Sequence, residues 1–174
     1  MKTVLNIEKH KYIPTYLLDN QCFACGKDNP EGLKMKFYTD GKKIFSQVYL
    51  HENKRGWEQI VHGGILSTIL DEIMAWSAIY FTERFVLTKS INVSYKNAVT
   101  INSKIKAIGW IEEIKDSKEA HLKGQIYNEK NILCAEANGT FALFSNKLAK
   151  KLKLMSAETI DQFEVFLKAC KKEY

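Results

Sequence analysis

The alternation of apolar and polar positions divides the sequence into two strands, one long helix and four further strands. Residues 33–39 and 44–50 alternate with a period of two, and the Asp40-Gly41 pair between them is a strong hairpin signal. From residue 63 to 83, large apolar side chains recur at helical spacing and cover most of the surface of the predicted helix. Alternation returns at residues 87–95, 100–114, 118–127 and 132–144.

This order predicts an α+β fold with an antiparallel sheet of about six strands. The strands after the helix follow one another through short hairpin loops, which antiparallel strands allow. A single buried helix among them indicates a sheet that curls around it. We expect one domain at 22–145, preceded by a leader at 1–21 with a short helix around 12–18. A Lys-rich helical tail follows at 146–174, with Ser156 as the N-cap of the last helix.

The composition is that of an ordinary globular protein, with 45% hydrophobic and 26% charged residues. The net charge of +6 comes partly from the tail, which reads as a solvated basic segment without a nucleic-acid motif. Binding of nucleic acid or a membrane by this tail is the alternative. No apolar run reaches the ~18 residues of a membrane span, and the first residues lack a signal-peptide pattern. A cytoplasmic protein is expected.

The four cysteines indicate neither a metal site nor a redox site. Cys22 and Cys25 form a lone CxxC, and Cys134 and Cys170 stand apart. A structural zinc site usually needs a second pair with matching spacing, and a redox CxxC expects a thioredoxin-like βαβ context. We therefore expect reduced structural thiols, with no metal and no bound cofactor.

The triplet His62-Gly63-Gly64 stands where a loop enters the long helix. Glycines let a ligand approach the backbone closely. The first amides of a helix have no partner within it, and the helix dipole favours negative charge there. The triplet therefore indicates either an oxyanion or anion site, or only a tight loop-to-helix junction.

Asp71 is a carboxylate near the middle of the predicted buried helix, which is costly unless the group is paired or used. Its neighbours three and four positions away, and at their multiples, are small: Gly64, Ser67, Thr68, Ala75, Ala78 and Thr82. Asp71 is thus a candidate general base or nucleophile, or else a satisfied polar residue at a packed interface. Glu72 points about a quarter-turn away and reads as a salt-bridge partner or a solvated group.

Gly63 and Asp71 are separated by about 12 Å along the helix axis. One carbonyl group of a ligand cannot contact both groups of the same chain. Either the two groups serve different sites, or the site is built from two antiparallel helices of a twofold dimer.

Four segments carry a family resemblance: CFACGKDNPEGLKMKF, GWEQIVHGGILSTILDE, LTKSINVSYKNAV and CAEANGTFALF. Together, over about residues 20–145, they resemble PaaI-like hot-dog thioesterases, the group that includes the mammalian thioesterase-superfamily members. The resemblance implies a hot-dog fold, in which an antiparallel sheet wraps a long helix. It also implies hydrolysis of an acyl-CoA-type thioester to free acid and CoA by a homodimer or homotetramer.

The same resemblance implies roles for individual residues. The Gly63 amide, with Gly64, would hold the thioester carbonyl oxygen, and Asp71 of the other chain would activate water or attack the carbonyl. His62 would orient the loop or polarise the carbonyl, and Thr88 would position the water. Some members carry Asn or Gln where this chain has Gly56, and Gln59 lies nearby as a substrate-binding candidate.

Two other functions remain open at this stage. A hot-dog dehydratase or hydratase also pairs a histidine with an acidic residue, and His62 with Asp71 fits that pattern. A non-catalytic acyl-CoA-binding or scaffold protein is the second alternative. Candidate lysines for the CoA phosphates are Lys89, Lys96 and Lys104. The sequence does not indicate the acyl group, the choice between dimer and tetramer, or the choice between a general-base and a covalent route.

Overall fold

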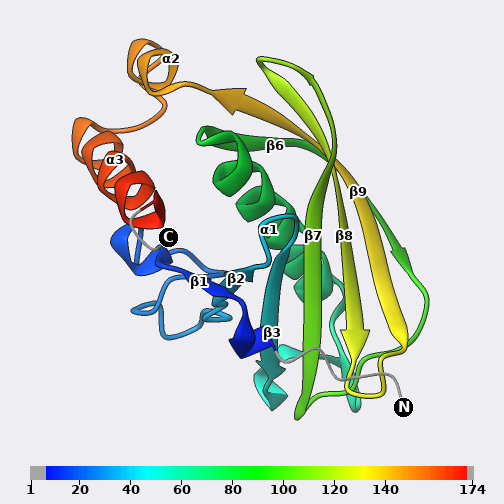
Figure 1. The fold of residues 1–174 in the computed structure, drawn as a ribbon. Helices are drawn as coiled ribbons and strands as arrows, with labels where there is room; N and C mark the ends of the chain where they lie inside the picture. The colour runs from blue at the N-terminus through cyan, green and yellow to red at the C-terminus, as the bar shows by residue number, and fades with distance from the viewer. Residues whose placement is uncertain (1–6, 172–174) are drawn as a thin grey trace.

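In the computed structural model, which describes residues 7–171, a seven-stranded antiparallel sheet curves around one long helix (Figure 1). The strands of the sheet lie in the order β1-β2-β3-β7-β8-β9-β6. Their bounds are β1 Lys11–Ile13, β2 Phe37–Thr39, β3 Ile44–Leu50, β6 Phe85–Tyr95, β7 Ser103–Asp116, β8 Glu119–Asn128 and β9 Leu133–Phe144. The central helix is α1, Gly63–Thr82. The predicted α+β fold is therefore confirmed.

Shorter elements complete the chain. A separate hairpin of β4 (Arg55–Trp57) and β5 (Ile60–Val61) leads into α1, where the sequence predicted only a loop. Two helices, α2 (Asn146–Lys151) and α3 (Ala157–Lys171), follow β9. Three single-turn 3₁₀ helices are η1 (Ile7–Lys9), η2 (Thr15–Leu17) and η3 (Glu52–Lys54).

The N-terminal part of the prediction needs correction. The short helix expected around 12–18 is wrong, because Tyr12 and Ile13 belong to β1, which pairs with β2 and adds the seventh strand. Only η2 is helical there. The strand expected at 33–39 is shorter, since the amides of Leu33 and Met35 bond to the carbonyls of Phe23 and Ala24 instead of a neighbouring strand.

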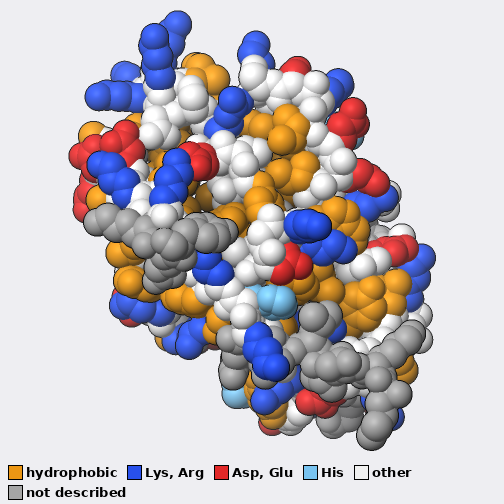
Figure 2. All heavy atoms as spheres, in the orientation of Figure 1, with side chains coloured by type: hydrophobic (Ala, Val, Ile, Leu, Met, Phe, Trp, Pro, Cys, Tyr) orange, Lys and Arg blue, Asp and Glu red, His pale blue; other side chains and the backbone are white. Residues whose placement is uncertain are grey.

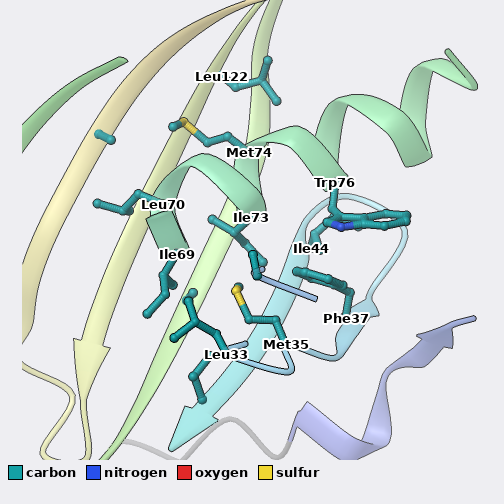
Figure 3. Packing of buried hydrophobic residues seen from close by; sticks show 14 of the residues in the cluster. Leu33, Met35, Phe37, Ile44, Ile69, Leu70, Ile73, Met74, Trp76 and Leu122 are labelled. Atoms are coloured by element: carbon teal, nitrogen blue, oxygen red, sulfur yellow. The ribbon is translucent and has the colours of Figure 1, made fainter. Parts of the chain in front are cut away.

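The core lies between α1 and the concave face of the sheet (Figure 3). Ile69, Ile73 and Met74 are fully buried, and Trp76 stacks on Phe37 with ring centroids 5.3 Å apart. The helix lies so close to the sheet that a Cβ on Gly109 of β7 would stand 2.5 Å from the Ile73 carbonyl oxygen. Glycine is therefore required at that contact.

The apolar character of α1 belongs to this packing. Among residues 7–171, α1 alone is long and apolar enough to cross a membrane by length and composition. Its large apolar side chains, however, form the centre of the core. Burial against the sheet accounts for the pattern without a membrane.

The C-terminal helices pack onto the same core. Phe163 of α3 stacks on Phe85 with centroids 4.2 Å apart, and Phe166 meets Trp76 edge-on. Ser156 caps α3 as predicted, because its Oγ accepts a 3.1 Å hydrogen bond from the Thr159 amide. Lysines gather at the α2 end of the molecule, and those of this region are exposed (Figure 2): Lys147, Lys150, Lys151 and Lys153.

Candidate functional site

His62 is the N-cap of α1 and shapes the first turn of the helix. Its backbone is extended, and its ring Nδ1 accepts a 2.9 Å hydrogen bond from the Gly64 amide. The Gly64 amide is thus engaged within the chain. Gly63 is the first helical residue, so its amide has no hydrogen-bond partner inside the helix. Its N–H points outward, beyond the N-terminal end of α1. Of the two predicted oxyanion donors, Gly63 is the one that can bind a ligand in this arrangement.

Gly56 explains how the loop fits beside this cap. A Cβ at position 56 would lie 2.7 Å from the His62 Cα, and the His62 amide bonds to the Lys54 carbonyl at 3.0 Å. The Asn or Gln that some similar enzymes carry here would therefore displace His62. Gln59 is exposed in the adjoining hairpin, and its carbonyl oxygen accepts from the Ile101 amide.

Asp71 and Thr88 form the second part of the candidate site. The Thr88 hydroxyl donates a 2.8 Å hydrogen bond to Asp71 Oδ1, which joins β6 to α1. Burial raises the pKa of Asp71 above its ordinary value, and the Thr88 hydrogen bond opposes that rise. Asp71 remains partly accessible, so its carboxylate can still reach a water molecule or a second chain.

The predicted site residues therefore fall into two groups. His62, Gly63, Gly64 and Gln59 lie at or before the start of α1, while Asp71 and Thr88 lie two turns further on. The helical span between Gly63 and Asp71 is about 12 Å along the axis. Within one chain the two groups cannot act on the same carbonyl.

Both groups lie along one side of the molecule that the chain itself leaves open. On α1 this side carries the small residues, of which Gly64 is exposed and Ser67, Thr68 and Ala75 are partly so. Beside them runs β6, the last strand of the sheet, which pairs only with β9 among the described residues. An 11-residue edge strand with an unpaired side is a ready template for a second chain.

Tyr95 is a site residue that the sequence did not reveal. Its hydroxyl donates a 3.0 Å hydrogen bond to the Gly63 carbonyl and lies 2.6 Å from Ser67 Oγ. Tyr95 and Gly63 border a cavity of about 330 Å³ that Lys96 and Val99 also line. Ser67 does not line this cavity. Tyr95 is the last residue of β6, and its side chain is 53% exposed.

A second cluster of titratable groups lies on another side of α1. Cys22, Cys25 and Glu72 bring their thiols and carboxylate within 4.8 Å of one another. A hydrogen bond from the Cys25 thiol lowers the pKa of Cys22 to about 5 and raises that of Cys25, while burial raises the pKa of Glu72 to about 7. The prediction that Glu72 is a salt-bridge partner or solvated is wrong, because its carboxylate is desolvated and accepts from Trp76 Nε1 at 2.9 Å.

This cluster lines a cavity of about 700 Å³ between α1, α3 and the segment around Cys22. None of the predicted catalytic residues borders it. This cavity is therefore separate from the Asp71–Thr88 pair.

Comparison with known proteins identifies the fold. Neither a family model nor a curated protein sequence matches the chain. Among solved structures it is similar to zebra fish thioesterase superfamily member 2, with 20% identity over 71% of this chain and 94% of that one and a TM-score of 0.61. It is also similar to the E. coli PaaI protein, with 13% identity over 65% and 81% of the two chains and a TM-score of 0.59.

A third similar structure is smu.793 from Streptococcus mutans UA159, bound to acetyl CoA. It shares 12% identity over 64% of this chain and 89% of that one, with a TM-score of 0.57. The strand order, the central helix and these structural similarities all indicate the same fold. The chain has the hot-dog fold found in proteins of the thioesterase superfamily.

Proposed function

We propose that this protein is a soluble, cytoplasmic acyl-CoA thioesterase whose site combines Gly63 of one subunit with Asp71 of the other. The observation that carries the proposal is the Asp71–Thr88 pair. A desolvated carboxylate, held by a hydroxyl at 2.8 Å, lies on the side of the chain that its own elements leave uncovered. A carboxylate in such a place serves better as a base or nucleophile than as a structural group.

Gly63 would activate the thioester carbonyl by binding its oxygen. Its amide lies at the N-terminus of a 20-residue helix, where the helix dipole favours a developing negative charge. A thioester carbonyl oxygen that accepts from this amide gains most in the tetrahedral transition state, because the oxygen is then an anion. His62 contributes by holding the turn through its bond to the Gly64 amide.

Asp71 supports the hydrolytic half. Thr88 occupies Oδ1, which leaves Oδ2 to accept a proton from water or to attack the carbonyl carbon. The raised pKa makes the carboxylate a stronger base than an exposed aspartate. In the general-base route Asp71 returns the proton to the departing CoA thiolate. In the covalent route the thiolate leaves as an anhydride forms on Asp71, and water then hydrolyses that anhydride to the free acid and the aspartate.

A twofold dimer brings these halves together. If β6 pairs with β6 of a second copy, the two sheets become continuous and the small-residue sides of the two α1 helices face each other. Small side chains allow the close approach that such a site needs. The Gly63 end of one α1 would then lie near Asp71 of the partner subunit.

The acyl-CoA class is supported by the neighbourhood of Gly63. The cavity of about 330 Å³ there has Lys96 in its wall, and a lysine suits the phosphates of CoA. Both candidate lysines are ion-paired, Lys96 with Glu136 at 3.1 Å and Lys89 with Glu119. Of the two, only Lys96 lines this cavity, so Lys96 is the better placed to bind the phosphates.

Thiol release from a panel of short, medium, long and aryl acyl-CoAs tests the proposal. The wild-type protein should release CoA, and Asp71→Asn should lower the rate by roughly 10²- to 10⁴-fold. Turnover of an enoyl-CoA without thiol release would favour a hydratase instead. Saturable acyl-CoA binding with no turnover of any substrate would favour a binding protein.

A further inference from the structure

Cys22, Cys25 and Glu72 converge although they come from two distant parts of the chain. Two residues belong to the turn that follows η2, and Glu72 lies in the middle of α1. Their ligand atoms all lie within 4.8 Å of one another, and Cys22 Sγ is 3.9 Å from Glu72 Oε1. Two thiols and one carboxylate are ligands that Zn²⁺ accepts.

The turn around the cysteines is already shaped to present both sulfurs. The Gly26 amide bonds to the Cys22 carbonyl at 2.9 Å, which closes the turn that carries both cysteines. A Cβ on Gly26 would lie 2.4 Å from the Asn20 carbonyl oxygen, so only glycine fits the turn. The turn therefore holds the two thiols beside each other and close to Glu72.

Charge in the cluster points the same way. None of the ion pairs between described residues involves Glu72, so its carboxylate has no lysine, arginine or histidine partner among them. A carboxylate without a basic partner, placed beside two thiols, is available to a metal ion. Trp76 Nε1 donates to Glu72 Oε1 at 2.9 Å and thereby fixes the carboxylate.

We infer that Cys22, Cys25 and Glu72 form a zinc site, with the fourth position open to the cavity of about 700 Å³. On a tetrahedral Zn²⁺, ligand atoms lie about 3.5–3.8 Å apart, so atoms that now lie within 4.8 Å of one another need to close by at most about 1.3 Å. The sequence expectation required a second cysteine pair. The fold supplies a carboxylate from α1 in its place, and the cavity admits water as the fourth ligand.

The zinc would tie the N-terminal turn to α1, one residue from Asp71. Binding removes the thiol protons, so that two thiolates and one carboxylate hold the ion. The inference does not depend on the proposed thioesterase activity, because the ion lies on another side of the helix and metal content is measured without a substrate.

Metal titration of the full chain tests the site. Protein that has been reduced, stripped with EDTA and desalted should take up one Zn²⁺ per chain, and Co²⁺ should give a thiolate charge-transfer band. Cys22→Ser and Cys25→Ser should abolish that band, and Glu72→Gln should weaken zinc binding by at least about tenfold. Cys170→Ser, a control that leaves the cluster intact, should bind like the wild type.

A second measurement needs no variant. Zn²⁺ should slow alkylation of Cys22 and Cys25 in the wild-type protein, as followed by mass spectrometry of the peptides that contain them. Failure of the reduced protein to bind Zn²⁺, zinc binding indifferent to Glu72→Gln, or a Cys22–Cys25 disulfide formed in a cytosolic glutathione buffer despite added Zn²⁺ would each overturn the inference.

Discussion

The Thr88 hydroxyl donates a 2.8 Å hydrogen bond to Asp71 Oδ1, and this bond joins the edge strand β6 to the central helix α1. It connects the two elements that flank the open side of the chain. The same bond counteracts the effect of burial on the pKa of Asp71. In the proposed reaction we expect Thr88 to act through Asp71.

Replacing Thr88 by alanine should shift the pH profile of kcat/KM to higher pH. The Thr88 hydrogen bond stabilises the ionised carboxylate, so its loss raises the pKa of Asp71, and the base is then protonated over a wider acidic range. Thr88→Ser keeps the hydroxyl and should retain the wild-type profile. Identical acid limbs for Thr88→Ala and the wild type would show that Thr88 does not tune Asp71.

The Gly63 amide can be tested by a pair of substitutions. Gly63→Pro removes the N–H at the first helical position, where proline is well tolerated, and the extended backbone of His62 suits a following proline. Gly63→Ala adds a similar Cβ near the Tyr95 hydroxyl but keeps the N–H. We expect kcat of Gly63→Pro to be roughly 10²- to 10³-fold below that of Gly63→Ala. Equal kcat values for both would remove the amide from the mechanism.

Tyr95→Phe should lower kcat/KM by about tenfold, because the hydroxyl that donates to the Gly63 carbonyl is lost. The ring is half-exposed, so the thermal unfolding midpoint should change little. Steady-state kinetics and a thermal melt on the same preparation separate the two effects. A large fall in the melting temperature together with unchanged kinetics would assign Tyr95 a structural role.

The C-terminal helix α3 should be essential to stability. Phe163 is fully buried against Phe85, and Phe163→Ala should lower the free energy of unfolding by roughly 3–5 kcal/mol in a denaturant titration. Val165→Ala changes an exposed residue of the same helix and should cost far less. Similar losses for the two variants would show that α3 is not anchored through Phe163.

The long helix and the later strands could be predicted from the sequence because each has one strong periodicity. Residues 63–82 and 44–50 form α1 and β3 almost as the pattern indicates. The first strand escaped prediction since Lys11–Ile13 is only three residues long and pairs with the distant β2. A segment that short has no period to detect.

The candidate site was predictable where a residue conflicts with its surroundings. Asp71 was identified because a carboxylate in an apolar helix is costly, and Gly63 because a glycine at a helix start lets a ligand approach unpartnered amides. Tyr95 and the contact between Cys22 and Glu72 depend on segments that only the fold brings together. Sequence spacing holds no information about such pairs.

Complementation between two inactive variants tests most directly whether the site is shared. Asp71→Asn and Gly63→Pro chains with different tags would be co-expressed, and their heterodimer isolated by two successive affinity steps. One chain then lacks the Asp71 carboxylate and the other lacks the Gly63 N–H. One of the two sites in the heterodimer therefore combines an intact Gly63 with an intact Asp71, and the other site has neither. The account predicts that the heterodimer recovers about half of the wild-type rate, although each homodimer is nearly inactive. A stable heterodimer as inactive as its parents would contradict a site built from two subunits.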